Sequence, residues 1–120
     1  MSRILIVDDE QQVRTLVSRY LESKGHDVLT AENGEVGVEL AVAEQPELVL
    51  MDLNMPVMDG FTATAAIRAR PETHDIKILI LSAENEEMNR EAAYEAGCDG
   101  FINKPIDFDR LLPRLEQVLH

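Results

Sequence analysis

Five short apolar runs, separated by segments with helical periodicity, constrain the fold of this chain more than any other feature of its sequence. The runs occupy residues 4–7, 28–29, 48–51, 78–81 and 101–102. Three of them (ILIV, LVLM and ILIL) are continuous rather than alternating, which is typical of strands buried on both faces of a parallel sheet. We therefore predict five β-strands in such a sheet.

Each run is followed by a segment with helical spacing, and the predicted helices cover residues 13–21, 34–44, 60–69, 86–96 and 108–119. Asn33 and Asp59 stand where N-cap residues are expected. Pro113 lies inside the last segment, where it either kinks the helix or marks the start of its regular part. The inward faces of the first two helices are predicted to be Val13, Leu16, Val17, Tyr20 and Leu21, and Val36, Leu40 and Ala43.

Strand and helix thus alternate regularly along the chain. Such alternation predicts an α/β fold of the doubly wound type, in which five helices cover both faces of a five-stranded parallel sheet through right-handed crossovers. We expect the strand order 2-1-3-4-5. No internal repeat or linker interrupts the pattern, so residues 1–120 are predicted to form one domain.

Polar side chains stand where the predicted strands end. In a parallel sheet these ends share one edge, which is where ligands bind, so we expect the side chains to converge there. They are Asp8, Asp9 and Glu10 after the first strand, Asp52 after the third, Ser82 after the fourth, and Asn103, Lys104 and Pro105 after the fifth.

The charges at this edge indicate a cation. The carboxylates of Asp8, Asp9 and Asp52 repel one another unless positive charge holds them, and Lys104 together with a divalent metal would balance them. Oxygen ligands favour Mg²⁺ over zinc. A metal and an ammonium beside a nucleophile suit phosphoryl transfer, and Asp52 is the best nucleophile because its strand is central in the expected order.

Composition narrows the class of protein. The formal net charge of −12 disfavours direct binding to nucleic acid or to an anionic membrane. Cys98 is the single cysteine, so no intrachain disulfide can form, as expected in a reducing cytoplasm. No apolar run is long enough to cross a bilayer, and the first residues do not match a signal peptide. We therefore expect a cytoplasmic protein.

The sequence resembles the response-regulator receiver family of two-component signalling systems. The resemblance is carried by IVDDE at residues 6–10, MDLNMPVMDGF at 51–61, LSA at 81–83 and KP at 104–105, in order over essentially the whole chain. It implies a flavodoxin-like receiver domain over residues 1–120. Such a domain is a phosphoacceptor switch rather than a conventional enzyme, although it promotes its own Mg²⁺-dependent phosphorylation and dephosphorylation.

The resemblance also implies roles for the residues at the sheet edge. Asp52 accepts a phosphoryl group from a histidine kinase or a histidine phosphotransfer protein, and Lys104 pairs with that group. Mg²⁺ is bound by Asp9, by Asp52 and by the backbone carbonyl of Asn54, while Asp8 acts through a metal-bound water. The downstream effector, whether a partner or an attached domain, is unspecified, and a homodimer linked to phosphorylation is compatible with the resemblance.

Further positions would transmit or time the signal. Ser82, in place of the commoner threonine, would move inward to hydrogen-bond the phosphoryl group. Phe101 would then change rotamer and alter the surface of the fourth helix, fifth strand and fifth helix; it lacks a hydroxyl, so its coupling must rest on packing. Asn54 and Glu84 occupy positions that tune hydrolysis, and a cis peptide bond before Pro105 would aim the preceding lysine.

Three other functions fit the residues of the sequence less well. A phosphatase with an aspartate nucleophile would need a second carboxylate two residues after Asp52, where Asn54 stands. A flavin-binding module of the same topology would need a phosphate-binding loop where residues 8–10 are acidic. A pseudo-receiver that serves only for docking would not need the site positions, all of which are filled.

Several of these residues also have purely structural interpretations. Asp8 and Asp9, taken alone, could cap the first helix. Asp59 with the following glycine is predicted to be a turn and cap. Cys98 is predicted to pack behind the fourth helix as a small apolar residue.

Overall fold

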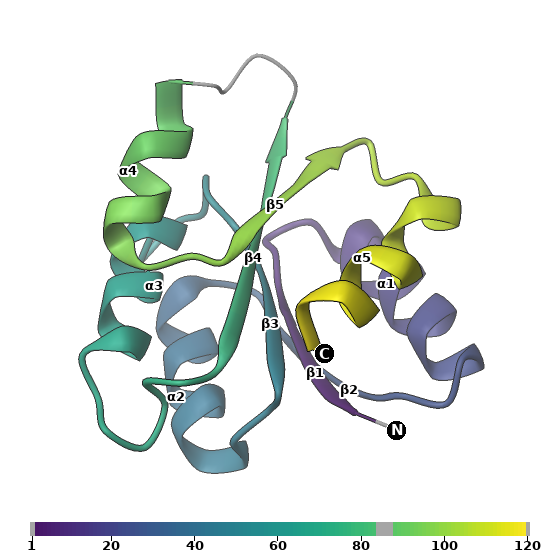
Figure 1. Ribbon diagram of the computed structural model, residues 1–120, viewed down its shortest axis with the longest axis horizontal. Coiled ribbons are helices and arrows are strands. Elements are labelled where there is room, and N and C mark those ends of the chain that lie inside the picture. The colour runs from purple at the N-terminus through teal and green to yellow at the C-terminus, as the bar shows by residue number, and fades with distance from the viewer. Residues whose placement is uncertain (1, 84–87, 120) are drawn as a thin grey trace.

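A computed structural model describes residues 2–83 and 88–119, in which strands and helices alternate along the chain (Figure 1). Every predicted element is present, and residues 86–87 of the fourth predicted helix lie outside the described residues. The strands are β1 (Arg3–Val7), β2 (Asp27–Ala31), β3 (Leu48–Asp52), β4 (Lys77–Ala83) and β5 (Gly100–Lys104). The helices are α1 (Gln11–Ser23), α2 (Gly34–Glu44), α3 (Gly60–Arg68), α4 (Met88–Ala96) and α5 (Phe108–Leu119).

The strands form one parallel sheet in the order β2-β1-β3-β4-β5, as the sequence predicts. In Figure 1, α2, α3 and α4 lie on one face of the sheet, and α1 and α5 lie on the other. Two apolar clusters fill these layers: one joins the sheet to α2, α3 and α4, and the other joins it to α1 and α5.

Burial of the central strands explains why their apolar runs are continuous. All five residues of β3 are buried. In β1, Leu5 and Val7 belong to the cluster under α2–α4, whereas Ile4 and Ile6 belong to the cluster under α1 and α5. Each such buried side chain contributes roughly 1.5–3 kcal/mol through the hydrophobic effect. A strand with helices on both faces therefore needs apolar residues at successive positions.

Helix caps are partly as predicted. The side chain of Asn33 accepts a hydrogen bond from the Val36 amide at the start of α2, and Asp59 caps α3 through the Thr62 amide. The cap interpretation of Asp8 and Asp9 is wrong, because the N-cap residue of α1 is Glu10, whose side chain makes no capping hydrogen bond.

Two helix faces differ in part from the prediction. Leu16 is 48% exposed at the margin of the α1 stripe, and Ala43 of α2 is also exposed. In α2 small residues face the sheet instead: a Cβ on Gly37 would lie 2.8 Å from Val7 Cγ2. Glycine allows this close approach because it has no side chain. The buried residues of α2 are Gly34, Gly37, Val38 and Ala41.

The α5 helix runs through Pro113, which lies five residues after its first residue. The helix is already formed before Pro113, so the proline does not mark where its regular part begins, and the kink stays a prediction. Cys98 is buried in the cluster with α2, α3 and α4, as predicted. Among the described residues, no helix combines the length and the apolar character needed to cross a membrane.

The loop between β3 and α3 folds back against the end of β3. The Met58 amide donates a hydrogen bond of 2.8 Å to the Pro56 carbonyl, which makes a γ-turn around Val57, and Val57 has φ of +71°. At the end of the loop, a Cβ on Gly60 would collide with the backbone carbonyl oxygen of Asp52. A glycine is thus required where the loop packs against the end of the strand.

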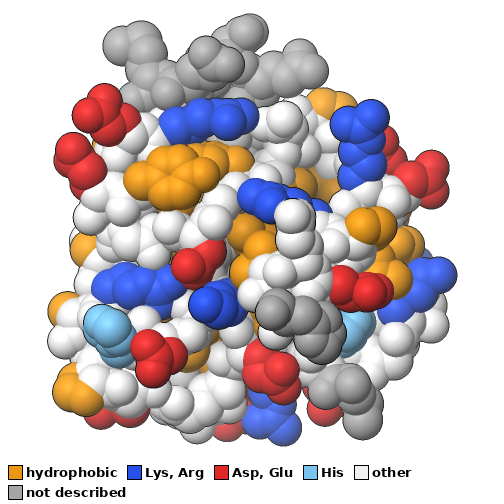
Figure 2. All heavy atoms as spheres, viewed as in Figure 1, with side chains coloured by type: hydrophobic (Ala, Val, Ile, Leu, Met, Phe, Trp, Pro, Cys, Tyr) orange, Lys and Arg blue, Asp and Glu red, His pale blue; other side chains and the backbone are white. Residues whose placement is uncertain are grey.

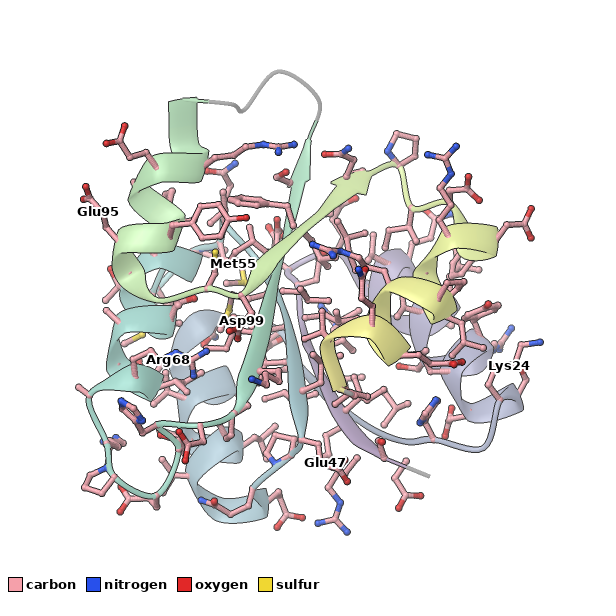
Figure 3. All side chains as sticks on the ribbon, in the orientation of Figure 1. Lys24, Glu47, Met55, Arg68, Glu95 and Asp99 are labelled. Carbon is pink, nitrogen blue, oxygen red and sulfur yellow. The ribbon has the colours of Figure 1, made fainter. Side chains whose placement is uncertain are left out.

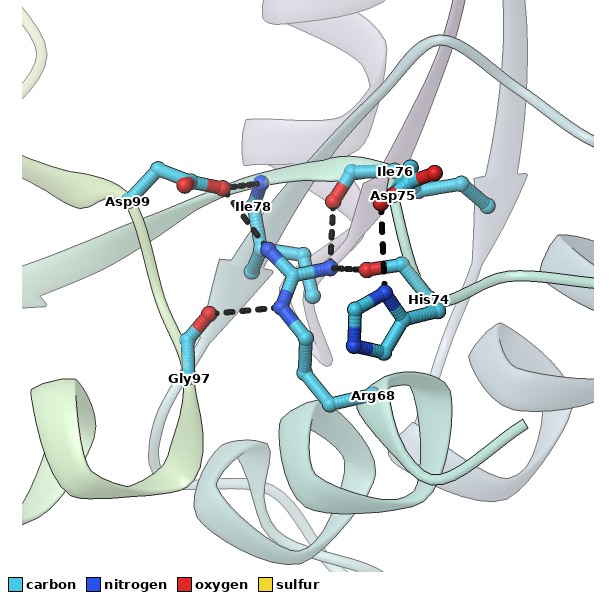
Figure 4. A network of polar contacts seen from close by, with 7 residues as sticks. All are labelled: Arg68, His74, Asp75, Ile76, Ile78, Gly97 and Asp99. Atoms are coloured by element: carbon cyan, nitrogen blue, oxygen red, sulfur yellow. Dashed lines mark hydrogen bonds and ion pairs between the residues drawn. The ribbon is translucent and has the colours of Figure 1, made fainter. Parts of the chain in front are cut away.

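A polar network joins the opposite edge of the sheet, at the amino ends of β4 and β5 (Figure 4). Arg68 of α3 and Asp99 point toward each other (Figure 3), and Arg68 Nη2 lies 2.8 Å from Asp99 Oδ2. The same carboxylate oxygen accepts a hydrogen bond from the Ile78 amide. The guanidinium also donates to the carbonyls of Gly97 (2.8 Å), His74 (3.0 Å) and Ile76 (2.5 Å).

Candidate functional site

The carboxyl ends of β1, β3 and β5 bring one ammonium group among several carboxylates. Lys104 Nζ lies 2.9 Å from Asp8 Oδ2, 3.5 Å from Asp52 Oδ1 and 3.4 Å from Glu10 Oε1. Asp8, Asp52 and Lys104 therefore converge at one edge of the sheet, as the positions of the strand ends predict.

The inner part of this site is buried and held by the backbone. The side chain of Asp8 is fully buried and that of Asp52 is 10% exposed. Asp8 Oδ1 accepts a hydrogen bond of 2.9 Å from the Glu10 amide, and Arg14 Nη1 donates to the Asp8 carbonyl at 2.6 Å. These bonds fix the turn between β1 and α1, and thus fix where the Asp8 carboxylate lies.

Burial and the excess of negative charge shift the pKa values of Asp52 and Lys104. Burial first, and the neighbouring Asp8 carboxylate second, raise the pKa of Asp52 to about 7 against the opposing effect of Lys104. Burial alone would lower the pKa of Lys104, but its hydrogen bond to Asp8 and the charges of Asp52 and Glu10 raise it. Lys104 is therefore a stable cation, and a single cation does not balance the carboxylates.

The donor atoms at the end of β1 fit a divalent cation. One carboxylate oxygen from each of Asp8, Asp9 and Glu10 lies within 4.8 Å of the others. Asp8 Oδ2 is buried and, apart from its ion pair with Lys104, has no hydrogen-bond partner among the described residues. An all-oxygen set of this kind suits Mg²⁺, which usually keeps several bound waters in proteins. Of the predicted magnesium ligands, this group contains Asp9, and the full set of Asp9, Asp52 and the Asn54 carbonyl stays a prediction.

The predicted switch residues lie on the two strands beyond β3. Ser82 is buried near the end of β4, beside Asn103 of β5. Phe101 of β5 is half-buried: the Tyr94 ring lies edge-on to it at 5.3 Å, and the Arg90 guanidinium lies 5.0 Å from its centroid. On the face seen in Figure 2, hydrophobic side chains gather over α4 and β5 with basic side chains around them.

The other predicted positions fall around this edge. Asn54 is exposed in the loop after β3, two residues beyond the phosphoacceptor candidate Asp52. The peptide bond between Lys104 and Pro105 is cis. Glu84 lies outside the described residues.

Sequence reasoning did not assign a role to two residues that contact the site. From the sequence, Glu10 is only an acidic residue after the first strand, yet it forms an ion pair with Lys104. The turn motif explains Gly60 only as a turn residue, but its lack of a side chain is what lets α3 begin against the Asp52 carbonyl. The signal for Glu10 was its position directly after two carboxylates, and for Gly60 no signal beyond a turn motif was present.

A family model of the response regulator receiver domain matches residues 4–116. The chain belongs to the response regulator receiver family. This receiver is 40% identical over 119 residues to the protein PilH of Pseudomonas aeruginosa, an alignment that covers 99% of the chain and 98% of PilH. It is 39% identical over 119 residues to the DNA-binding dual master transcriptional regulator RpaA of Synechocystis sp.. That alignment covers 99% of the chain and 49% of RpaA, so the receiver spans about half the length of this relative.

Solved structures show the same fold. The receiver domain of the sensor histidine kinase PA1611 from Pseudomonas aeruginosa PAO1 superimposes on this receiver with a TM-score of 0.91 at 30% identity, covering 98% of this chain and 97% of that one. The PA1611 structure has a magnesium ion coordinated in its active site cleft. The family model and these relatives identify the chain as a receiver domain of the two-component response-regulator type.

Proposed function

We propose that this receiver accepts a phosphoryl group on Asp52 from a phosphohistidine of a histidine kinase or a histidine phosphotransfer protein, with Mg²⁺ bound beside it. The observation that carries the proposal is the position of Asp52: its carboxylate ends the central strand and lies 3.5 Å from the Lys104 ammonium. A carboxylate and a cation therefore lie side by side at the edge where ligands bind in such sheets, which supports a nucleophilic role for Asp52.

The transfer uses groups of this chain as follows. An oxygen of the Asp52 carboxylate attacks phosphorus, the bond from phosphorus to the imidazole nitrogen breaks, and its electron pair stays on that nitrogen. Lys104 stabilises the charge on the phosphoryl oxygens. The switch is reset by hydrolysis. Water attacks phosphorus, the bond to the Asp52 oxygen breaks with its electron pair returning to the carboxylate, and the water protons leave with phosphate and solvent. The receiver is therefore a self-resetting switch rather than a conventional enzyme.

Mg²⁺ would be held by Asp9, Asp52 and the backbone carbonyl of Asn54, with Asp8 acting through a bound water. When bound, it supplies positive charge to the carboxylates and to the phosphoryl oxygens. Support comes from the carboxylate oxygens gathered at the end of β1 and from the magnesium ion in the PA1611 receiver.

The phosphorylated state would be read at the surface of α4, β5 and α5. Phosphorylation adds charge and acceptor oxygens, which favour the state in which Ser82 is drawn toward the phosphoryl group and Phe101 changes rotamer. Support comes from the burial of Ser82 on the strand next to β3 and from the half-buried position of Phe101. Asn54 and Glu84 would set the lifetime of the acyl phosphate.

The partner at this surface is a protein or an attached effector domain, and a homodimer linked to phosphorylation is compatible with the same surface. The net charge of −12 supports a protein partner rather than direct contact with nucleic acid or an anionic membrane. RpaA is named as a DNA-binding regulator, but this receiver matches only about half of it.

Intact-protein mass spectrometry after incubation with acetyl phosphate tests the proposal. Wild type should gain one phosphoryl group with Mg²⁺ and none with EDTA, and Asp52→Asn should gain none. Asp59→Asn is the matched control, because Asp59 is an exposed cap of α3 and asparagine keeps the cap. If wild type gains nothing from acetyl phosphate or from a panel of phosphorylated histidine donors, Asp52 is not the phosphoacceptor.

A further inference from the structure

The side chain of Glu10 has an unusual position for a residue that caps a helix. It is the N-cap residue of α1, yet it makes no capping hydrogen bond, and its carboxylate oxygen Oε1 lies 3.4 Å from Lys104 Nζ. The Glu10 side chain is 61% exposed, whereas those of the other two carboxylates on Lys104 are 0% and 10% exposed. Glu10 therefore contacts the ammonium from the solvent side, at the mouth of the site.

We propose that Glu10 is a positioning residue for Lys104 that strengthens cation binding before phosphorylation and competes with the incoming phosphoryl group for the ammonium. The proposal rests on the proposed function of Asp52 and deepens it. Glu10 would thus favour the binding of Mg²⁺ and oppose the binding of the phosphoryl group at the same site.

The geometry explains why the ion pair between Glu10 and Lys104 should be the one that breaks when a phosphoryl group binds Lys104. A lysine ammonium has three hydrogen atoms to donate, and three carboxylates already surround Lys104. A phosphoryl group on Asp52 needs one of these donors. Loss of the ion pair to Lys104 would be costly for the fully buried Asp8 carboxylate, whereas Glu10 is exposed and water replaces its ion pair at little cost.

The negative charge of Glu10 should also slow phosphorylation and favour Mg²⁺ binding. Its carboxylate adds negative potential beside Asp8 and Asp9, which attracts a divalent cation and repels an anionic phosphodonor. Replacing the carboxylate with an amide of the same shape removes both the ion pair and the charge. The variant should then bind Mg²⁺ more weakly and, once Mg²⁺ is saturating, accept a phosphoryl group faster.

The test compares Glu10→Gln with Glu39→Gln, which makes the same change of charge at an exposed position of α2. Titration calorimetry with Mg²⁺ at fixed ionic strength should give a Kd that is roughly two- to fivefold higher for Glu10→Gln, the size expected of an exposed ion pair. The initial rate of phosphorylation by acetyl phosphate at saturating Mg²⁺ should rise by about the same factor. Both differences should shrink at high salt, and Glu39→Gln should match wild type.

The outcomes separate this proposal from the proposed function. If Glu10→Gln equals Glu39→Gln in both measurements, or is phosphorylated more slowly than wild type at saturating Mg²⁺, Glu10 does not compete for Lys104. If wild type itself takes no phosphoryl group from any donor, the proposed function fails and the competition fails with it. A weaker Mg²⁺ affinity together with faster phosphorylation is the one result that supports the proposal.

Discussion

Asp52 ends β3 in a buried position where its pKa is raised from 3.8 to about 7, first by burial and then by the Asp8 carboxylate. A raised carboxyl pKa means that the folded state holds a proton that the unfolded chain has already lost. Between these two pKa values the unfolded state binds fewer protons, so stability must fall as pH rises. At low pH, where Asp52 is protonated in both states, this penalty is absent.

We therefore expect the metal-free wild type to lose stability relative to Asp52→Asn as pH rises from about 4 to about 7. The difference should reach roughly 1–3 kcal/mol, less than the full pKa shift implies because part of the site is open to water. Urea unfolding of both proteins in EDTA across this pH range measures it. Other carboxylates titrate in both proteins and cancel, so a constant difference across the range would contradict the assignment.

Val57 is a β-branched residue at φ of +71°, and its side chain is 74% exposed in the loop after β3. Such a conformation is unfavourable for valine, and the exposed side chain gains little burial in return. Asparagine adopts positive φ more readily, so Val57→Asn should stabilise the protein by about 0.5–1 kcal/mol. Val57→Ala keeps a Cβ and should gain less. Thermal or urea unfolding compares the variants, and a loss of stability in Val57→Asn would mean that the strain is small.

At the scale of elements, Arg68 ties α3 to the amino ends of β4 and β5. Its guanidinium donates to backbone carbonyls on both sides and pairs with Asp99, whose carboxylate also receives the Ile78 amide. A Cβ on Gly97 would lie 2.6 Å from Arg68 Cγ, so the chain before β5 is packed directly on this side chain. Removal of the guanidinium would leave these acceptors and one carboxylate without their donor.

Arg68→Met should therefore destabilise the protein by roughly 2–4 kcal/mol, since it leaves partly buried acceptors unsatisfied. Arg68→Lys should recover little, because an ammonium cannot reach the same acceptors in one plane. Arg70→Met, at an exposed position two residues on, is the control and should change stability by less than about 0.5 kcal/mol. Urea unfolding at constant m-value gives these differences. Equal effects at both positions would show that the network contributes nothing beyond surface charge.

The elements themselves were predictable because their signals are local. A buried strand such as β3 needs consecutive apolar residues, and the caps Asn33 and Asp59 act within a few residues of their own position. The inward face of α2 was not predictable, because Gly37 contributes no apolar side chain to a periodic pattern. Its role depends on how closely the helix backbone approaches Val7, which is a property of the packed layers.

The same distinction holds for the site. Strand ends at one edge of a parallel sheet bring Asp8, Asp52 and Lys104 together whatever their side-chain rotamers, so their convergence followed from topology. The contact between Glu10 and Lys104 joins residues 94 positions apart and depends on the direction of an exposed side chain. The cation–π contact between Arg90 and the Phe101 ring likewise depends on how α4 packs on β5. Periodicity carries no information on either.

At the scale of the whole molecule, the net charge of −12 acts on stability in two separable ways. General repulsion among surface carboxylates is relieved by any salt, since at 0.1 M ionic strength the interaction between exposed charges falls off over about 10 Å. The carboxylates at the carboxyl edge of the sheet are closer together than this and partly buried, so monovalent salt screens them poorly. A bound divalent cation should relieve that local repulsion specifically.

We expect NaCl to raise the urea midpoint of wild type, Asp9→Asn and Asp27→Asn alike. At matched ionic strength, Mg²⁺ should stabilise wild type and Asp27→Asn further, by about 2.7 kcal/mol when its concentration is a hundred times Kd. Asp9→Asn should lose most of this added stability, because Asp9 is one of the gathered carboxylates, whereas Asp27 begins β2 at an exposed position. If Mg²⁺ stabilises all three proteins equally, its effect is screening of the whole surface, and the metal assignment of Asp9 is wrong. If it stabilises only the two proteins that keep Asp9, Mg²⁺ binds at a specific site that includes Asp9. The carboxylates proposed to serve phosphorylation would then also determine how Mg²⁺ stabilises the fold.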